Sequence, residues 1–443
     1  IFDMELEKIY NAKDYEDKIY EKWESSGAFS PKIATGKKSF TIMMPPPNAT
    51  GTLHLGHAVM LALEDIMIRY HRMKGEASLW IPGTDHASIA TQNKVEKLLA
   101  EEGLTRHQLG REKFLDRVHK FVKKSQNTIR RQIRKMGSSC DWSREKYTLE
   151  PSLSLAVREI FTRMYKDGLI YRGHRIVNWC PRCASTLADD EVEYREENAK
   201  FYYFKYGPVV IGTARPETKF LDKTIIVHPD DKRYKHLHGK KFEVEWIDGK
   251  VSANVIADSV IDPEFGTGAM TITPAHSFED FDLAKKYDLP IVQIIDEKGN
   301  FTSAAGEFAG KNARGSRDEI VKILQEKGLV ERIDENYKHK LYVCYRCDTP
   351  VEPLVSKQWF ISVSKKFKAG KSLKDIALEV VKKGKIKILP ERFEKTYFHW
   401  MENLRDWCIS RQIWFGHQIP VWYCECEQPI VQVETPKKCP HCG

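Results

Sequence analysis

The chain has 443 residues, which is enough for two or three domains with cores of their own. A hydrophobic content of 41% and a charged content of 30% are those of a soluble globular protein. No apolar stretch approaches the length of a membrane span, and the first residues lack the pattern of a secretion signal, so we expect a cytoplasmic protein without a membrane segment. The net charge of +9 suits a polyanionic partner, but 71 basic against 62 acidic residues is too mild a bias to identify one.

An N-terminal helical segment is expected over residues 1–35. From Phe40 to about Tyr171, strand-like and helix-like segments alternate, as in a doubly wound parallel sheet. The helix beginning at His54 carries an apolar stripe with helical spacing that we expect to pack on this sheet. The stripe consists of Val59, Met60, Leu63, Ile66 and Met67. Further helices are expected over residues 94–103 and 114–136.

Near residue 200 the sequence changes to short β-branched or aromatic runs separated by Gly, Pro and Asp. We therefore expect a β-rich insert over residues 193–340, flanked on both sides by a pair of cysteines. The segment 36–192 is then the first half of an outer domain, and residues 341–443 return to that domain after the insert.

Eight of the ten cysteines form close pairs, and in a chain without a secretion signal such pairs favour zinc over disulfides. Four thiolates leave no open coordination position on a zinc ion, so each group predicts a structural site. The spacing Cys-x-x-Cys is the stronger signal for zinc, and Cys-x-Cys is the weaker one. Reduced cysteines without metal are the alternative. The first predicted site consists of Cys180, Cys183, Cys344 and Cys347, and the second of Cys424, Cys426, Cys439 and Cys442. The remaining Cys140 and Cys408 are expected to be packing residues.

The most informative segment leads from a strand-like run through a proline- and glycine-rich turn into a helix. It reads Pro45-Pro46-Pro47-Asn48-Ala49-Thr50-Gly51-Thr52-Leu53-His54-Leu55-Gly56-His57. The two imidazoles are three residues apart and share one helix face, at a helix N-terminus whose N–H groups and dipole favour phosphate. Gly56 lets a flat ring lie close to the backbone. A surface histidine pair or half a zinc site is the alternative interpretation.

This segment resembles the first signature, the HIGH motif, of class I aminoacyl-tRNA synthetases. A second segment is similar to the valyl branch of that family: Gly83-Thr84-Asp85-His86-Ala87-Ser88-Ile89-Ala90-Thr91-Gln92. The resemblance covers essentially the whole chain and implies an α/β fold, with a Rossmann-like doubly wound parallel sheet interrupted by a β-rich editing domain and zinc knuckles. It also implies a monomer that uses ATP with Mg²⁺, valine and tRNA(Val) as substrates.

The resemblance also implies roles for individual residues in amino-acid activation. His54 and His57 would stabilise the ATP phosphates while a carboxylate attacks the α-phosphate, with Thr50 and Gly56 at the nucleotide. Fixed donors and positioning are the expected mode of catalysis. Asp85, which could instead cap the helix that follows it, would bind the substrate ammonium. The walls of the valine pocket would be Pro46, Pro47, Asn48, Trp359 and Trp407.

The second signature of the family, a lysine-rich KMSKS loop, does not occur in this sequence. We therefore expect a fragment that lacks this loop and the anticodon-binding domain. Such a fragment should form little valyl-adenylate by itself.

Two glycine-rich segments of the insert, residues 212–218 and 265–276, resemble the editing domain of the valyl, isoleucyl and leucyl enzymes. An apolar pocket rejects an added hydroxyl by only about 100-fold, for which valyl-tRNA synthetase against threonine is the standard example, so mischarged threonyl-tRNA must be hydrolysed. The resemblance places Thr213, Arg215, Thr218 and Phe265 around the editing pocket and Asp280 on the substrate ammonium. The alternative interpretation is that these segments are solvated turns and strand edges that bind no ligand.

Two positions depart from the valyl pattern. Ser277 stands where an aspartate is common and Thr271 where a lysine is common. Both changes bear on the contact to the threonine hydroxyl.

Three other interpretations remain beside a valine ligase with editing in the same chain. An isoleucyl enzyme is disfavoured by residues 83–92. A free-standing editing hydrolase would leave the histidine signature and the two tryptophans without a role. A zinc-dependent tRNA-binding module without catalysis is the third.

Overall fold

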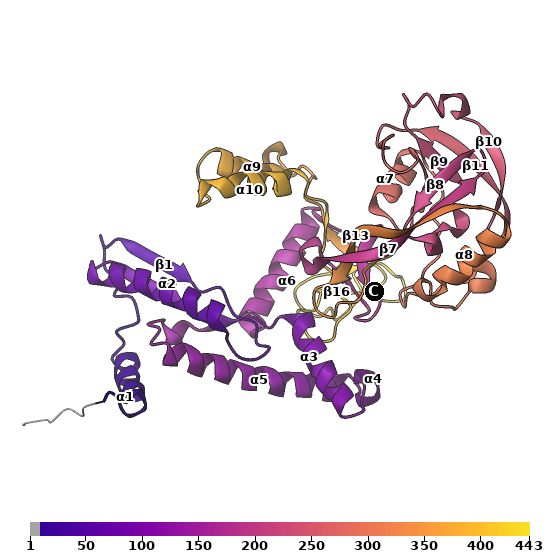
Figure 1. The fold of residues 1–443 in the computed structure, drawn as a ribbon. Helices are drawn as coiled ribbons and strands as arrows, with labels where there is room; N and C mark the ends of the chain where they lie inside the picture. Colours follow the sequence, from indigo (N-terminus) through magenta and orange to yellow (C-terminus); the bar gives the residue numbers. More distant parts are fainter. Residues whose placement is uncertain (1–8) are drawn as a thin grey trace, which may run out of the picture. The chain divides into compact units, whose positions relative to one another are not determined.

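The computed structural model describes residues 9–443, which form two compact units. One unit combines residues up to 163 with residues 413–443, and the other contains residues 164–412 (Figure 1). The part of the expected N-terminal helical segment before residue 9 lies outside the described residues. None of the helices in the described range is both long enough and apolar enough to cross a membrane.

The first unit is a mixture of helices and short strand pairs. Its helices are α1 (Ala12–Ser25), α2 (Leu55–Met73), α3 (Ser88–Glu101), α4 (Arg106–Leu109), α5 (Arg111–Lys135) and α6 (Pro151–Lys166), the last of which runs into the second unit. Strand β1 (Ser39–Met43) pairs in parallel with β2 (Ala77–Ile81), and β3 (Gly83–Thr84) pairs in parallel with β4 (Lys146–Tyr147). Strands β16 (Val421–Trp422) and β17 (Ile430–Val431) are antiparallel. The expected α/β class is confirmed, with the parallel strands of the described residues assigned to separate two-stranded pairs.

Helix α2 packs with a different face from the one we expected. Leu61 and Ile68 are buried in a cluster with Met44, Trp80 and Ile129. On the same face, Glu64 accepts a hydrogen bond from the indole N–H of Trp80 at 2.8 Å.

The predicted stripe was therefore wrong for four of its five members. Val59, Leu63, Ile66 and Met67 are exposed, and only Met60 packs partly against the cluster. The helix has apolar residues on two faces, and hydrophobic periodicity alone does not say which of them the β1–β2 pair covers.

Helix α5 supplies the second core of this unit. Its buried side chains recur every three or four residues, so they form one face of the helix. They are Phe114, Val118, Val122, Ser125, Ile129 and Ile133. Part of this face packs on Val95 and Leu99 of α3, and Phe415 from the C-terminal segment joins the same cluster.

The second unit is rich in antiparallel strands. One sheet has the order β10 (Lys241–Trp246), β11 (Gly249–Ala257), β9 (Thr224–Val227), β12 (Ala269–Thr271). Another has the order β13 (Val330–Cys344), β7 (Val192–Tyr206), β8 (Val209–Thr213). The third has the order β15 (Trp407–Cys408), β14 (Glu352–Ile361), β5 (Ile170–Cys180), β6 (Ser185–Leu187). Its helices are α7 (Phe278–Lys286), α8 (Arg317–Glu326), α9 (Leu373–Lys382) and α10 (Glu394–Glu402).

Strands β7 and β13 form a long two-stranded ribbon. Their pairing extends from Val192 opposite Cys344 to Phe204 opposite Val330, and the register shifts twice, between Val330 and Arg332 and between Asp334 and Tyr337. Toward its Val330 end the ribbon enters the β-rich body, whose core is built around Trp246, Tyr206 and Phe204 (Figure 1). At its other end it reaches the first group of cysteines.

Candidate functional site

The turn after β1 lies against the segment that follows β2. The amide of Ala49 donates to the carbonyl oxygen of Asp85 at 2.8 Å, and the amide of Asp85 donates to the carbonyl oxygen of Pro47 at 2.9 Å. These bonds form a parallel bridge between Asn48 and Asp85. The structure thus brings together three residues that the sequence placed in one amino-acid site, at the carboxyl ends of parallel strands where α/β proteins bind ligands.

The two histidines close the N-terminus of α2. His54 is the N-cap, and its Nδ1 accepts a hydrogen bond from the amide of Gly56 at 3.1 Å. His57 Nδ1 accepts from the amide of His54 at 3.3 Å. Because each Nδ1 accepts, the neutral rings carry their proton on Nε2, which is then the donor that each ring offers to a ligand. Burial, followed by the charge on His54, lowers the pKa of His57 and favours this neutral form.

Gly56 is required by the fold of His54. A Cβ at this position would lie 3.0 Å from Cε1 and 3.1 Å from Nδ1 of the His54 ring. A larger residue would therefore crowd the ring and require it to shift by a few tenths of an ångström. Thr50 is half-buried, and its amide donates to the carbonyl oxygen of Asn48 at 2.8 Å, while Pro46 is exposed.

Asp85 is held as an ionised carboxylate. Its Oδ1 accepts hydrogen bonds from the Thr148 hydroxyl at 2.8 Å and from the Ala87 amide at 3.1 Å, and lies 3.2 Å from Nδ1 of His86. Burial acts to raise the pKa of Asp85, but the bonds from His86, Ala87 and Thr148 outweigh it and lower the pKa to about 2. These three contacts all fall on one carboxylate oxygen.

The backbone beside Asp85 is strained. Ala87, the N-cap of α3, has a φ of 45°, in the left-handed region that residues other than glycine rarely adopt. Strain of this kind is concentrated at functional sites. Here it accompanies the turn that aims the Ala87 amide at Asp85.

The C-terminal segment of the chain completes this region. The side-chain oxygen of Gln92 accepts a hydrogen bond from the amide of Trp414 at 2.9 Å. The rings of His86 and His417 pack edge to face, with their centroids 4.9 Å apart. No role was predicted for Thr148, Gln92 or His417. Gln92 ended the recognised segment, but Thr148 and His417 carried no signal of their own.

The two tryptophans predicted for the valine pocket belong to the second unit. Trp359 is buried on β14 against Tyr165, with ring centroids 6.0 Å apart. Trp407 is 53% exposed and sits opposite Ile361 in the β14–β15 pair. Their place in the pocket stays a prediction.

The first predicted editing segment follows β8. Thr213 ends this strand, and its hydroxyl accepts from the amide of Arg215 at 3.0 Å. The 3-10 helix η3 (Pro216–Leu221) begins directly after, and the hydroxyl of Thr218 donates to the carbonyl oxygen of Arg215 at 3.0 Å. Arg215 is therefore fixed between two of the predicted threonines.

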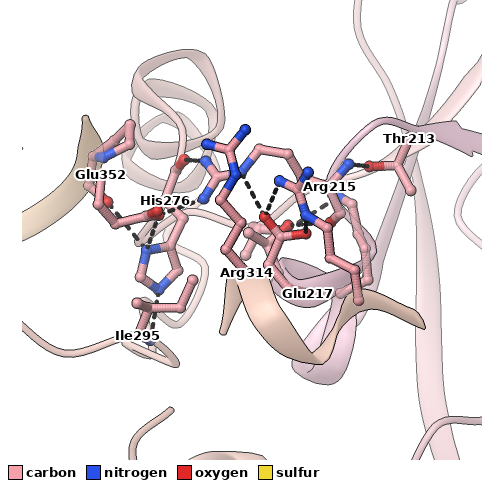
Figure 2. A network of polar contacts seen from close by, with 12 residues as sticks. Thr213, Arg215, Glu217, His276, Ile295, Arg314 and Glu352 are labelled. Atoms are coloured by element: carbon pink, nitrogen blue, oxygen red, sulfur yellow. Dashed lines mark hydrogen bonds and ion pairs between the residues drawn. The ribbon is translucent and has the colours of Figure 1, made fainter. Parts of the chain in front are cut away.

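Arg215 belongs to a network of buried charges (Figure 2). Its guanidinium contacts Glu352, Glu217 and the carbonyl oxygen of His276. Glu217 is 2% exposed and also receives two bonds from Arg317, at 2.7 and 2.6 Å. Burial opposes the charge on Arg215, but the two glutamates raise its pKa above the ordinary value.

His276 is committed to structure. Its Nε2 accepts from the amides of Ile294 and Ile295 at 3.0 and 3.2 Å, and its Nδ1 lies 3.1 Å from the carbonyl oxygen of Pro353 and 3.4 Å from Glu352. Both ring nitrogens are thus occupied. The histidine fixes the second editing segment rather than offering a base to a ligand.

The predicted ammonium anchor is buried in the first turn of α7. Asp280 is 4% exposed, and its Oδ2 accepts from the amide of Thr273 at 2.7 Å. Ser277 is the N-cap of this helix, a role that a serine performs as well as an aspartate. Phe265 is 61% exposed at the glycine-rich turn and meets Phe201 edge to face, and its place at the pocket stays a prediction.

A cavity of about 720 Å³ adjoins this network. Arginines and acidic residues dominate its charged lining, among them Arg215, Glu217, Arg314, Arg317, Glu352 and Arg405. Its size is sufficient for a nucleoside-sized ligand. Ala214 and His276 from the two editing segments contribute to the wall, as does the neighbouring Ser277. Of the five predicted editing residues, Arg215 lines the cavity.

The expected grouping of eight cysteines is confirmed. In each group of four, the sulfurs lie within 4.8 Å of one another, and all ten cysteines, which fall in the described part of the chain, are free thiols. In the first group, Sγ of Cys347 lies 3.5 Å from Cys180 and 3.6 Å from Cys183. Four sulfurs at about 2.3 Å from a tetrahedral zinc would be about 3.8 Å apart, so this group fits the ion. The second group is more exposed and less regular, with separations from 3.0 to 3.7 Å.

Comparison with known proteins decides the family. A family model described as tRNA synthetases class I (I, L, M and V) matches residues 18–439. The chain belongs to the class I tRNA synthetases. This match extends through both compact units and includes all the grouped cysteines except Cys442.

Relatives within this family are similar along the whole chain. Valine–tRNA ligases of Desulfotalea psychrophila and Dehalococcoides mccartyi are each 47% identical over 99% of this chain, and that of Thermotoga maritima is 46% identical. The chain spans about half the length of these relatives. A solved ternary complex of Agrobacterium radiobacter K84 LeuRS with tRNA and LeuAMS aligns with 96% of the chain and 52% of its own, at 16% identity and a TM-score of 0.43.

The polar groups that the sequence did not predict are mainly hydrogen-bond or ion-pair partners of the predicted site residues. Glu217 lies inside a recognised segment and could have been found there. Glu352 and Arg317 come from other elements, and no motif pointed to them. Only the pairing of distant strands and the packing of α8 bring them to the site.

Proposed function

We propose that this class I synthetase chain activates valine with ATP for transfer to tRNA(Val), and that its β-rich part hydrolyses mischarged threonyl-tRNA(Val). The relatives that match it over 99% of its length are valine–tRNA ligases, which disfavours an isoleucyl enzyme. The observation that carries the proposal is the ionised Asp85 carboxylate held beside the Pro47–Ala49 turn. A small amino acid needs such an anion for its ammonium group.

In this proposal the residues of the first unit position the reacting groups. Asp85 binds the valine ammonium, and Pro46, Pro47 and Asn48 form one wall of the side-chain pocket. His54 and His57 donate from Nε2 to phosphate oxygens as negative charge builds on the α-phosphate. Thr50 and Gly56 lie at the nucleotide, where the bare glycine leaves room for it.

The finer architecture is also part of the proposal. The parallel pairs β1–β2 and β3–β4 are components of one doubly wound sheet in the outer domain, and residues 193–340 form the editing domain. The two groups of cysteines hold structural zinc, which would fix the chain where four thiolates converge and leave no position for a substrate. ATP enters with Mg²⁺, which neutralises phosphate charge.

In the proposed editing reaction, Asp280 binds the ammonium of the threonyl ester, and Thr213, Arg215, Thr218 and Phe265 surround the substrate. The network around Glu217 and Glu352 fixes Arg215 in place. Water then attacks the ester carbonyl carbon, and the bond to the ribose oxygen breaks to release threonine and tRNA. This second activity is favoured by the buried carboxylate of Asp280 and by the adjoining cavity.

Binding of a valyl-sulfamoyl adenosine tests the activation site. The full chain should bind this analogue by calorimetry far more tightly than its isoleucyl counterpart, and Asp85→Asn should weaken binding at least tenfold. Asp14→Asn, an exposed substitution on α1, is the control. Equal binding by wild type and Asp85→Asn would refute the assignment of Asp85. A C-terminally extended chain should show stronger valine-dependent ATP–pyrophosphate exchange than this one.

Deacylation of threonyl-tRNA(Val) tests the editing site separately. Asp280→Ala should abolish hydrolysis by the full chain, and Asp262→Ala, at a solvated turn, should leave it unchanged. Hydrolysis that persists in Asp280→Ala would remove the anchor role. If the chain hydrolyses threonyl-tRNA but binds no valyl analogue, the free-standing hydrolase is the better interpretation.

A further inference from the structure

Lys219 lies in a buried charged cluster beside the editing segments. Its side chain leaves η3 and is almost fully enclosed, with the residue 8% exposed. The ammonium contacts the carbonyl oxygen of Thr271 at 3.0 Å, the hydroxyl of Thr273 at 3.1 Å and Oδ2 of Asp222 at 2.9 Å. All three N–H groups of the ammonium thus have an oxygen within reach.

Thr273 connects this ammonium to two buried carboxylates. Its hydroxyl donates to Oδ1 of Asp222 at 2.8 Å, and its amide donates to Oδ2 of Asp280 at 2.7 Å. The hydroxyl receives from Lys219 and donates to Asp222, so its orientation is fixed from both sides. Lys219 therefore acts on Asp280 across space and through the position of Thr273.

The cluster carries more negative than positive charge. Lys219 contributes one positive charge, whereas Asp222 and Asp280 contribute two negative charges when both are ionised. Buried charges are costly unless they are paired. An added ammonium group would balance the three side chains, and that is the group carried by an aminoacyl ester.

A buried hydroxyl beside the ammonium points to a ligand as well. The hydroxyl of Thr271 is enclosed and has no hydrogen-bond partner among the residues that the structure describes. Buried polar groups in folded proteins are nearly always bonded to protein, water or ligand. Thr271 is also the position where the family resemblance leads us to expect a lysine, and here the ammonium of Lys219 contacts the backbone carbonyl oxygen of this residue.

We propose that Lys219 is a positioning residue of the editing site, whose ammonium holds Asp222, Thr273 and the ionised carboxylate of Asp280 ready for the substrate ammonium. The inference rests on the proposed editing function. Lys219 lies outside both segments that resemble the editing domain, residues 212–218 and 265–276, so the proposal adds a residue to that site.

The electrostatics of Asp280 agree with this role. Burial raises the pKa of Asp280, and the charge of Asp222 adds to the effect. Lys219, the Thr273 amide and the Ser277 hydroxyl act in the opposite direction. The net effect is a pKa above the ordinary value, because burial outweighs the effects that lower it, and removing the ammonium should raise the pKa of Asp280 further.

The test is the pH profile of threonyl-tRNA(Val) hydrolysis by the full chain, under single-turnover conditions with excess protein between pH 5.5 and 8. Lys219→Met should move the acid limb of kcat/KM upward by about one pH unit and lower hydrolysis at pH 6 about tenfold. Activity at pH 8 should be largely retained. Lys219→Arg, which keeps the charge, should return the acid limb toward that of wild type.

Lys223→Met is the matched control, because this lysine is exposed four residues further along the same segment. Lys219→Gln, which keeps N–H donors without charge, replaces Lys219→Met if circular dichroism shows that the latter is unfolded. A profile that keeps its shape, or falls equally at every pH, would overturn the positioning role alone. Absence of hydrolysis by the wild-type chain would overturn the editing function with it.

Discussion

The hydroxyl of Thr148 donates a hydrogen bond to Oδ1 of Asp85 at 2.8 Å across 63 residues of sequence. The same hydroxyl accepts from the amide of His86 at 2.9 Å. The parallel pairing of Gly83 with Lys146 and of Thr84 with Tyr147 places the threonine there. One short strand pair thus brings to Asp85 one of the three hydrogen-bond partners that lower its pKa.

Removing this hydroxyl should weaken the amino-acid site without changing its shape. Thr148→Val deletes one of the bonds that lower the pKa of Asp85, so affinity for valyl-sulfamoyl adenosine should fall about five- to tenfold, as for a lost hydrogen bond to a charged group. Titration calorimetry measures this directly. Thr128→Val, on the exposed side of α5, should have no effect. Wild-type affinity in Thr148→Val would show that Asp85 does not depend on it.

Glu217 should be essential to the stability of the second unit. Glu217→Gln removes the charge that faces both Arg215 and Arg317 in a buried setting, and because these arginines are partly solvated we expect a loss of about 2 kcal/mol. The urea midpoint of the transition that unfolds the β-rich unit is the measurement. Glu331→Gln breaks an exposed pair with Lys205 and should cost less than about 0.5 kcal/mol. Equal midpoints for the two variants would contradict this account.

Glu352 should make this unit sensitive to acid. Burial acts to raise the pKa of Glu352, but Arg215 and His276 outweigh it, so the pKa in the folded state lies below the ordinary value. The stabilisation is then complete above the unfolded pKa of about 4.3 and is lost as pH falls below it. Glu352→Gln should lower the urea midpoint at pH 7, and its difference from wild type should stay constant down to about pH 4.3 and shrink as the pH falls below that value.

A difference that stays constant with pH would show that Glu352 stabilises by packing alone. Glu402→Gln is the control, because the side chain of this residue is largely exposed. It should leave the pH dependence unchanged.

Metal analysis should separate the grouped cysteines from the single ones. Natively purified protein should contain about two zinc ions per chain, and Cys347→Ser should remove about one of them, because three thiolates and a hydroxyl bind the ion less well. Cys408→Ser, at a buried cysteine outside both groups, should keep both ions. Folded protein that contains no zinc would show that these thiols are reduced cysteines without a metal.

The sequence predicted best those features that are local or that repeat a strong motif. The histidine pair at the start of α2, the helices α3 and α5 and the cysteine pairs all follow from spacing within short segments. The family resemblance, and no rule of local spacing, placed Asn48 and Asp85 at one amino-acid site. The joining of Cys180 and Cys183 with Cys344 and Cys347 was expected from the flanking positions of the two pairs on either side of the insert.

The remainder depended on long-range packing. Glu352 reaches Arg215 across 137 residues, and Thr148 reaches Asp85 across 63, because strands from separate parts of the chain lie in register. Nothing in the sequence around Lys219 indicates that its side chain is buried, and only the fold of η3 turns this side chain inward. The stripe on α2 failed because two faces of that helix are apolar and periodicity does not rank them.

The ribbon of β7 and β13 has a mechanical consequence. Fifteen residues of extended chain measure about 50 Å, and the cysteines tie the ribbon down at one end only. The two register shifts lie next to the opposite end, where bulges disrupt the ladder and bend a strand. The contacts of Arg215 with Glu352 and of His276 with Pro353 also attach the β-rich body to β14, so the body has a second anchor beside the ribbon. The cavity is lined by residues of the body and by His339 and Lys340 of β13, and its shape therefore depends on both attachments.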